Sequence, residues 1–232
     1  MDRPYDFESI YQGPALVQYK QAVVPWDIGE PQPAVVALES AGAFSKDVLD
    51  AGCGVGDNAV YLSARGYRVT GFDYAATALR QAEQRAEALG VAVEFVQSDA
   101  TRLDNLAQEF DTVLDSGLYH SLARQQRAEY AAALAKVCRP NARLHLLCFS
   151  DEAQDEFPDP HRISDTELRN TFTGPAWHLA EVHRDTYVTA FTKDYVEKQA
   201  GGQFPSLDIR TLTFDAAGRL TRPIWRLAAV RL

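Results

Sequence analysis

The stretch Val48-Leu49-Asp50-Ala51-Gly52-Cys53-Gly54-Val55-Gly56 decides the fold, because a short apolar run leads into closely spaced glycines and then into a helical pattern. Glycine lets the backbone approach a ligand that a Cβ atom would keep away. In open α/β sheets, ligands bind at this first turn from strand to helix. Asp73 ends the next apolar run, where its carboxylate can accept hydrogen bonds from ribose hydroxyls. The stretch and this acid together predict a nucleoside-containing cofactor.

The spacing of the glycines indicates which nucleoside cofactor binds. A dinucleotide-binding turn has the pattern G-x-G-x-x-G, and Asp57 occupies the place of the third glycine counted from Gly52 and Gly54. A carboxylate there would repel a pyrophosphate at the helix N-terminus. Asp50 adds a second acid just before the glycines. These charges favour a ligand with an ammonium and a sulfonium group, S-adenosyl-L-methionine (SAM), and count against the alternative of a nicotinamide-dependent reductase.

Outward from this turn, short apolar runs alternate with helical patterns, which predicts a parallel sheet built from βαβ units. The expected strands cover residues 47–50, 67–73, 93–97, 110–114 and 143–149. The expected helices cover residues 34–41, 57–65, 75–89, 124–138 and 165–172. Near the C-terminus, residues 207–214 and 223–232 flank a turn, which predicts two strands forming an antiparallel edge on an otherwise parallel sheet.

Two segments interrupt this alternation, and we interpret both as lids over the C-terminal edge of the sheet. Residues 1–45 are expected to form an N-terminal lid segment and residues 46–232 the single catalytic domain, with a second lid at residues 151–175. The lids carry aromatic side chains that suit a flat, apolar ligand. These are Tyr5, Phe7, Tyr11, Tyr19, Trp26 and Phe157.

Four motifs in order resemble those of class I SAM-dependent methyltransferases, at residues 50–56, 71–73, 96–100 and 110–115. The resemblance implies a Rossmann-like, doubly wound α/β fold with a mostly parallel seven-stranded sheet of order 3-2-1-4-5-7-6 and an antiparallel last strand. It also implies the cofactor site. Asp50 and the backbone of Gly52 and Gly54 hold the methionine end, and Asp73 takes the ribose. Asp99 and the amide of Ala100 read the adenine, and Asp115 and Ser116 lie beneath the sulfonium. Tyr74 is a further cofactor-binding residue.

Two further stretches refine the resemblance. Residues 25–33 resemble the N-terminal motif of halide/thiol and thiopurine-type methyltransferases, whereas residues 115–120 and 146–151 resemble bacterial enzymes that methylate hydroxyquinolone-type toxins. The resemblance implies methyl transfer to oxygen, nitrogen or sulfur of a small, aromatic heterocyclic acceptor. A halide/thiol or metalloid-detoxifying methyltransferase is one alternative, and a non-catalytic SAM-binding regulatory protein is a second.

Several candidate residues have two interpretations. Trp26 is expected to face the sulfonium through a cation–π contact or to bind the cofactor carboxylate through its indole N–H, or else only to anchor the N-terminal segment. Tyr119 and His120 follow the fourth strand, where we expect them at the substrate. His120 is a candidate general base, or a residue that only shapes the pocket. Asp99 has an alternative role in capping the turn at Thr101.

Composition limits the remaining functions. The 232 residues include 23 Lys and Arg against 32 Asp and Glu, a formal net charge of −9, which disfavours a nucleic-acid partner. The sequence has no apolar run of membrane-spanning length and no secretory signal pattern, and its three cysteines are too few for a disulfide framework. We therefore expect a cytoplasmic monomer or homodimer without a membrane partner. No metal is expected, because the histidines show no metal-ligand spacing.

Overall fold

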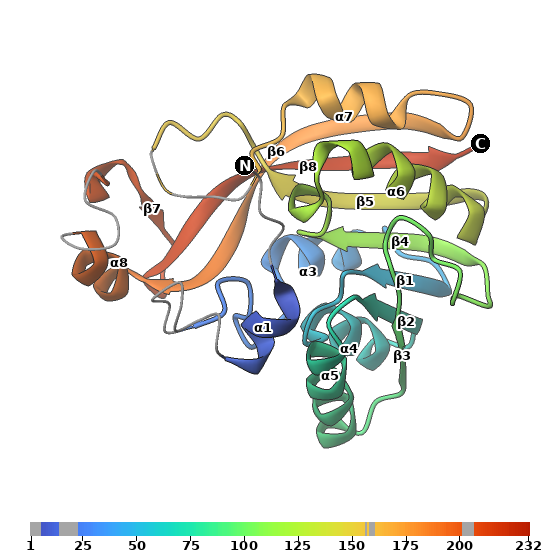
Figure 1. Cartoon of the computed structure of the whole chain (residues 1–232), viewed down its shortest axis with the longest axis horizontal. Coiled ribbons are helices and arrows are strands. Elements are labelled where there is room, and N and C mark those ends of the chain that lie inside the picture. The colour runs from blue at the N-terminus through green and yellow to red at the C-terminus, as the bar shows by residue number, and fades with distance from the viewer. Residues whose placement is uncertain (1–5, 14–22, 156, 158–160, 201–206) are drawn as a thin grey trace.

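A computed structural model describes residues 6–13, 23–155, 157, 161–200 and 207–232. The described residues form one eight-stranded sheet of order β3-β2-β1-β4-β5-β8-β6, with β7 paired to β8 (Figure 1). The strands are β1 (Asp47–Ala51), β2 (Arg68–Asp73), β3 (Val93–Gln97), β4 (Phe110–Ser116), β5 (Cys138–Phe149), β6 (Trp177–Thr192), β7 (Thr213–Phe214) and β8 (Arg219–Arg231).

The five strands β1 to β5 are parallel, and β8 runs antiparallel to both of its neighbours, β5 and β6. All five residues of β1 are buried, as expected for the central strand of a sheet covered on both faces. The Rossmann-like fold, its mostly parallel sheet and its antiparallel last strand are therefore confirmed.

Two details of the predicted sheet are corrected. The sheet has eight strands instead of seven, because β6 was not among the predicted strands. The segment predicted as a strand at residues 207–214 contains a short 3₁₀ helix, η2 (Ile209–Thr211), and only the two-residue strand β7. The strand predicted at residues 223–232 is longer and lies next to β5, where the predicted order places the last strand, but the edge strand beyond it is β6 and not residues 207–214. β7 pairs with β8 at two residues only, whereas β6 pairs with it over most of its length, so β6 forms the edge.

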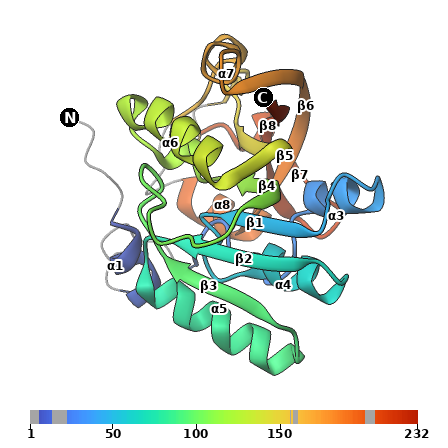
Figure 2. The ribbon, with the colours of Figure 1, turned by 90° about the vertical axis from the view of Figure 1, so that its right-hand side faces the viewer.

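Helices cover both faces of the sheet (Figure 2). On one face, α3 (Pro33–Ser40) and α4 (Asp57–Ala64) share an apolar cluster with β1 and β2, and α5 (Ala76–Leu89) packs against β3. On the other face, α6 (Arg124–Val137) and α7 (Asp165–Phe172) share a second cluster. Since α3 belongs to the core, the part of the expected N-terminal lid that reaches the sheet edge is α1 (Phe7–Gln12) with residues 23–32. No described helix is both long and apolar enough to cross a bilayer.

Strands β6 and β8 extend beyond the parallel strands and carry α8 (Lys193–Ala200) at their far end (Figure 1). A small separate apolar cluster stabilises this extension; it consists of Phe157, Phe191, Val196, Leu207, Leu212 and Leu220. The N-terminal segment is attached to the extension, because the Gln32 side chain forms two hydrogen bonds with the backbone of Val188. The Ala190 amide also donates to the Pro25 carbonyl. Together these segments enclose the space above the sheet edge.

Candidate active site

A cavity of about 580 Å³ lies at the C-terminal ends of the parallel strands, between the sheet edge, α1 and the extension. Eight of the predicted site residues line it: Trp26, Gly52, Asp73, Tyr74, Asp99, Ala100, Ser116 and His120. Four others do not: Asp50, Gly54, Asp115 and Tyr119. Parallel strands bring all their C-terminal ends to one edge, and for this reason motifs far apart in sequence meet here.

The glycine turn is shaped by what packs on it. At Gly52 the backbone φ is 65°, and a Cβ atom would lie 2.8 Å from the Leu118 Cβ. At Gly54, with φ of 54°, a Cβ atom would lie 2.7 Å from the Tyr11 hydroxyl oxygen. Any larger residue would be strained in backbone and would collide with these neighbours. Both glycines are thus required for the close approach of α1 and of the β4 loop to the turn.

Asp73 connects the glycine turn to the end of β2. Its Oδ2 accepts a hydrogen bond from the Gly54 amide at 2.9 Å, and its Oδ1 accepts one from the Ala75 amide at 2.8 Å. Burial raises the pKa of this carboxyl, and the backbone hydrogen bonds oppose that rise. A carboxylate has about four lone-pair sites, so Asp73 can still accept hydrogen bonds from a ligand in the cavity.

Asp50 and Asp115 are two buried carboxyls on the neighbouring strands β1 and β4. Burial raises the pKa of each to about 7, and in Asp50 the charge of Asp115 adds to the effect. Asp115 accepts hydrogen bonds from the Tyr130 hydroxyl at 2.8 Å and the Leu118 amide at 2.9 Å. It therefore fixes the loop after β4 instead of lining the cavity. Asp50 is buried in β1 behind the glycine turn and does not line the cavity.

Two buried polar atoms in this region have no hydrogen-bond partner among the described residues: Asp50 Oδ2 and Ser116 Oγ. A buried polar group without a partner is costly. Only Ser116 of these two residues lines the cavity, so its hydroxyl marks a place where a ligand can complete the site. The glycine turn is surrounded by acceptor oxygen atoms, including the carboxyls of Asp50 and Asp73. Such surroundings match a ligand that carries an ammonium and a sulfonium group. The residues present thus fit SAM, and they do not offer the positive surroundings that a pyrophosphate requires.

Trp26 lines the cavity, but its indole N–H is already used. It donates to the Tyr11 hydroxyl at 2.7 Å, and the Trp26 ring packs edge-on against Phe7 with centroids 5.7 Å apart. Its predicted contact with a cofactor is therefore limited to the ring. Glu8 of α1 connects this helix to α5, because its carboxylate accepts hydrogen bonds from the Thr77 amide and hydroxyl. Tyr11 was predicted only as one of the lid aromatics, and its place over the glycine turn had no local signal.

We expect Tyr11→Phe to weaken SAM binding by about 1 kcal/mol, because the substitution leaves the Trp26 N–H without its acceptor and loosens α1 over the glycine turn. Titration calorimetry with SAM measures the change. Tyr61→Phe is the matched control, since it removes a hydroxyl bonded to Glu39 outside the cavity. Equal SAM affinity of Tyr11→Phe and the wild type would contradict a role for this contact.

Asp99 and Ala100 lie at the turn after β3. The Asp99 Oδ1 accepts hydrogen bonds from the Thr101 amide at 2.8 Å and the Thr101 hydroxyl at 2.7 Å, which is the capping role considered from the sequence. Asp99 is nevertheless exposed and lines the cavity beside the buried Ala100. One carboxylate oxygen can fix the turn while the other faces a ligand.

His120 lies in the 3₁₀ helix η1 (Tyr119–Ser121) and is buried against Phe149. The two rings stack with centroids 4.2 Å apart and planes 9° apart. The Phe149 amide donates a hydrogen bond to the His120 Nδ1 at 3.2 Å. Burial, with Arg127 and His161 nearby, lowers the His120 pKa to about 3. The ring is therefore neutral at pH 7, with its proton on Nε2.

Tyr119, predicted at the substrate, points away from the cavity. Its ring is fully buried, its hydroxyl is 3.0 Å from the Thr171 Oγ1 in α7, and Phe172 and Arg127 pack on it. Adjacent residues of a 3₁₀ helix project in different directions, so only one of the two neighbours can face the cavity. Packing of η1 against α7 gives that position to His120.

The outer wall of the cavity was largely missed from the sequence. It is aromatic, and its members come from β5, the loop after it, and β6: Phe149, Phe157, Tyr187 and Phe191. Arg222 of β8 also contributes to the wall, and its guanidinium forms two hydrogen bonds with Asp155, both at 2.9 Å. Only Phe157 had been singled out, as a lid aromatic. Phe149 ends β5, a predicted strand, whereas Tyr187 and Phe191 lie on β6, which was not predicted.

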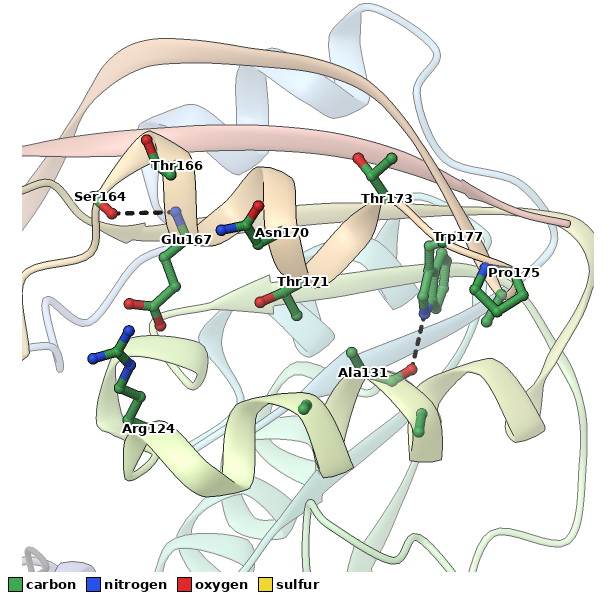
Figure 3. Close-up of a pocket in the computed structure, with 14 residues that line it drawn as sticks. Arg124, Ala131, Ser164, Thr166, Glu167, Asn170, Thr171, Thr173, Pro175 and Trp177 are labelled. Carbon is green, nitrogen blue, oxygen red and sulfur yellow. Dashed lines mark hydrogen bonds between the residues drawn. The ribbon is translucent and has the colours of Figure 1, made fainter.

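A second hollow, of about 490 Å³, lies between α6 and α7 (Figure 3). It contains none of the predicted site residues. The hydrogen bonds around this hollow are structural. The Trp177 indole of β6 donates to the Ala131 carbonyl of α6 at 2.8 Å, and the Ser164 hydroxyl oxygen caps the start of α7. We therefore assign the chemistry to the cavity at the sheet edge.

The fold and this site define a nucleoside-binding enzyme of the Rossmann-like type, and comparisons specify its class. A family model described as "Methyltransferase domain" matches residues 48–141. A 2-heptyl-1-hydroxyquinolin-4(1H)-one methyltransferase from Mycobacteroides abscessus is 37% identical over 165 residues, covering 70% of this chain and 72% of the relative. The chain belongs to the class I SAM-dependent methyltransferases. It is a small-molecule methyltransferase, and SAM is its cofactor.

Solved structures agree. A protein whose structure concerns the conversion of a disulfide bond into a thioacetal group during echinomycin biosynthesis is 31% identical, with a TM-score of 0.79 over 97% of this chain and 90% of that chain. Magnesium protoporphyrin IX methyltransferase from Synechocystis PCC 6803, with bound SAM, has a TM-score of 0.58 and 19% identity over 86% of this chain and 76% of that chain, which shows the shared fold.

Proposed function

We propose that this enzyme transfers the methyl group of SAM to an oxygen, nitrogen or sulfur atom of a small, flat heterocyclic acceptor. One observation carries the proposal: a single cavity joins the acidic glycine-turn side to an aromatic wall formed by Phe149, Phe157, Tyr187 and Phe191. Aromatic faces suit a planar apolar ligand. The hydroxyquinolone methyltransferase relative supports the same class of acceptor.

In this proposal the cofactor lies along the inner side of the cavity. Asp73 accepts hydrogen bonds from the ribose hydroxyls, and Asp99 with the Ala100 amide lies at the adenine, with Tyr74 exposed at the rim. The backbone of Gly52 and Gly54 approaches the methionine end. The negative charge of Asp50 favours the ammonium group. SAM supplies an activated methyl group on a positively charged sulfur.

The protein's own contribution is alignment and exclusion of water. The acceptor must approach the methyl group opposite the sulfur, so a rigid wall that orients its ring supplies most of the acceleration. Phe7, Tyr11 and Trp26 cover the cavity from the N-terminal side, and Phe157 and Phe191 cover it from the extension. These aromatic groups separate the reacting atoms from bulk water.

A sulfur acceptor is the second candidate, because the 31% identical relative concerns the conversion of a disulfide bond into a thioacetal group. A halide is a poor match, since a single ion offers no ring face for the aromatic wall to contact. A regulatory protein that only binds SAM would need no second, aromatic compartment beside the cofactor residues.

A screen with SAM and mass-spectrometric detection tests the proposal. The acceptors are 2-heptyl-1-hydroxyquinolin-4(1H)-one, substituted phenols, aromatic thiols, small alkyl thiols and iodide. We expect the methylated product with the aromatic heterocycle and little product with iodide or alkyl thiols. A strong preference for iodide or small thiols would replace the proposal by the halide/thiol alternative. SAM binding without methylation of any acceptor would favour the regulatory alternative.

A further inference from the structure

His120 presents a hydrogen-bond donor, and no free acceptor, to the cavity. Its Nδ1 lone pair is occupied by the Phe149 amide, so the neutral ring carries its proton on Nε2. The stack on Phe149 fixes the ring plane. Among the described residues, no hydrogen-bond partner is found for Nε2. The only ring nitrogen that remains for a ligand is therefore an N–H group.

The surroundings of His120 keep it in this state. Burial is the main cause of its low pKa, and the charges of Arg127 of α6 and His161 of the loop after β5 lower that pKa further. His161 also contacts the His120 carbonyl oxygen through its Nδ1 at 3.1 Å. On the β6 side, the Tyr187 hydroxyl donates to the Ser116 carbonyl at 3.3 Å. Asp115 lies behind η1, where backbone amides and Tyr130 occupy its oxygens. None of these contacts makes His120 basic.

Gly117 lines the cavity next to the imidazole edge of His120. A Cβ atom there would lie 3.5 Å from the His120 Cε1, 3.9 Å from its Nε2 and 3.6 Å from the Tyr187 hydroxyl oxygen. The imidazole edge and this hydroxyl therefore adjoin one point of the cavity wall. An oxygen atom of a bound ligand can receive the Nε2 hydrogen bond at this point.

Resting on the proposed function, we infer that the acceptor is bound as an oxyanion, an ionised hydroxyl of the heterocycle, and that the Nε2–H of His120 donates a hydrogen bond to this oxygen. His120 thus selects the ionised acceptor and positions it, and it does not remove its proton. Hydrogen bonds to an ionised acceptor are shorter and stronger than those to a neutral one.

The reaction balances without a protein base. The acceptor loses its hydroxyl proton to solvent before or during binding. One lone pair of the oxyanion forms the new O–C bond with the methyl carbon, and the C–S bond breaks with its electron pair remaining on sulfur. The negative oxygen and the positive sulfur both become neutral. A second oxygen lone pair remains for the His120 hydrogen bond throughout.

Ionisation of a bound acceptor provides the first test. The probe is 2-heptyl-1-hydroxyquinolin-4(1H)-one, titrated by absorbance on the full-length enzyme saturated with S-adenosylhomocysteine. We expect its hydroxyl to ionise at least one pH unit lower when bound than when free. His120→Phe keeps the stack on Phe149 but removes the donor, and we expect it to reverse most of that shift. His145→Phe is the control, because His145 is equally buried, at 6% exposure, on a part of β5 outside the cavity.

A bound probe that ionises at the same pH as the free probe would overturn the inference, as would equal shifts in the wild type and His120→Phe. Failure of the probe to bind would also overturn it, while methyl transfer to other acceptors in the screen would leave the proposed function intact. If the screen yields no methylated product at all, the proposed function itself fails.

The pH dependence of kcat/KM separates the two roles of His120. We expect the acidic limb of the profile to follow the pKa of the acceptor when acceptors of different acidity are compared. His120→Phe should lower kcat/KM by 10- to 100-fold without moving that limb. A limb that stays at one pH for all acceptors and disappears in His120→Phe would identify His120 as a general base and overturn the inference.

Discussion

Asp50→Asn should stabilise the ligand-free enzyme at pH 8 while weakening its binding of SAM. The Asp50 side chain is buried, and burial beside Asp115 raises its pKa to about 7 from 3.8. Because the folded-state pKa lies above the unfolded value, the protonated carboxyl contributes stability below pH 4. That contribution decreases as the pH rises and is lost above about pH 7. Asparagine stays neutral, so the variant avoids this loss.

We expect the variant to gain on the order of 1–3 kcal/mol of unfolding free energy at pH 8 and little at pH 4, measured by urea denaturation without ligand. Asp104→Asn is the control, because Asp104 is exposed and forms a surface ion pair with Arg102. If Asp50→Asn and the wild type lose stability equally between pH 4 and pH 8, Asp50 is not the buried acid that titrates there.

The same substitution should reduce SAM affinity by at least about tenfold at pH 8, because it removes a negative charge that favours the ammonium group. For the same reason, wild-type affinity should increase as the pH rises through 7, and the variant should lack that increase. Calorimetry at pH 6 and pH 8 measures both effects. The site would then be a case in which a destabilising buried charge is retained for binding.

Asp73→Ala should produce the largest loss of cofactor affinity. The carboxylate is expected to bind the ribose, and in the ligand-free structure it also fixes the amides of Gly54 and Ala75. Its removal costs the ligand a pair of charge-assisted hydrogen bonds, about 1–3 kcal/mol or roughly a 5- to 150-fold weaker Kd. It also removes the side-chain connection between the glycine turn and the end of β2, and leaves the backbone hydrogen bond from the Cys53 amide to the Phe72 carbonyl.

Calorimetry with SAM measures the loss, and Asp73→Asn separates its two parts. Asparagine can still accept a hydrogen bond from one of the two amides, so we expect intermediate affinity and a stability closer to the wild type. Asp208→Ala serves as the control, since Asp208 pairs with Arg210 on the surface. Unchanged SAM affinity of Asp73→Ala would contradict the assignment of the ribose site.

The cofactor side of the cavity could be predicted because its residues belong to short continuous motifs. Gly52, Asp73, Asp99 and Ser116 each stand at or just after the C-terminal end of a strand. Parallel strands bring those ends to one edge, so strand order and local spacing are enough to assemble them. The glycine turn and its acids also determined the choice of SAM over a dinucleotide, since that choice depends on charge within one segment.

The acceptor side depended on contacts between segments that are distant in sequence. Arg222 reaches the cavity wall paired with Asp155, 67 residues away. The Tyr11 hydroxyl lies over the glycine turn only because α1 packs on α5. No local pattern encodes such a pairing, because it depends on how the extension and the N-terminal segment close over the sheet.

The sequence by itself determined the class of fold, the cofactor and the edge of the sheet where chemistry occurs. These follow from periodicity, glycine spacing and charge, which act over a few residues. Only the tertiary structure decided that His120 faces the cavity while Tyr119 turns to α7, and that the imidazole offers an N–H there. Side-chain direction and protonation depend on packing and burial, which exist only once distant segments have come together.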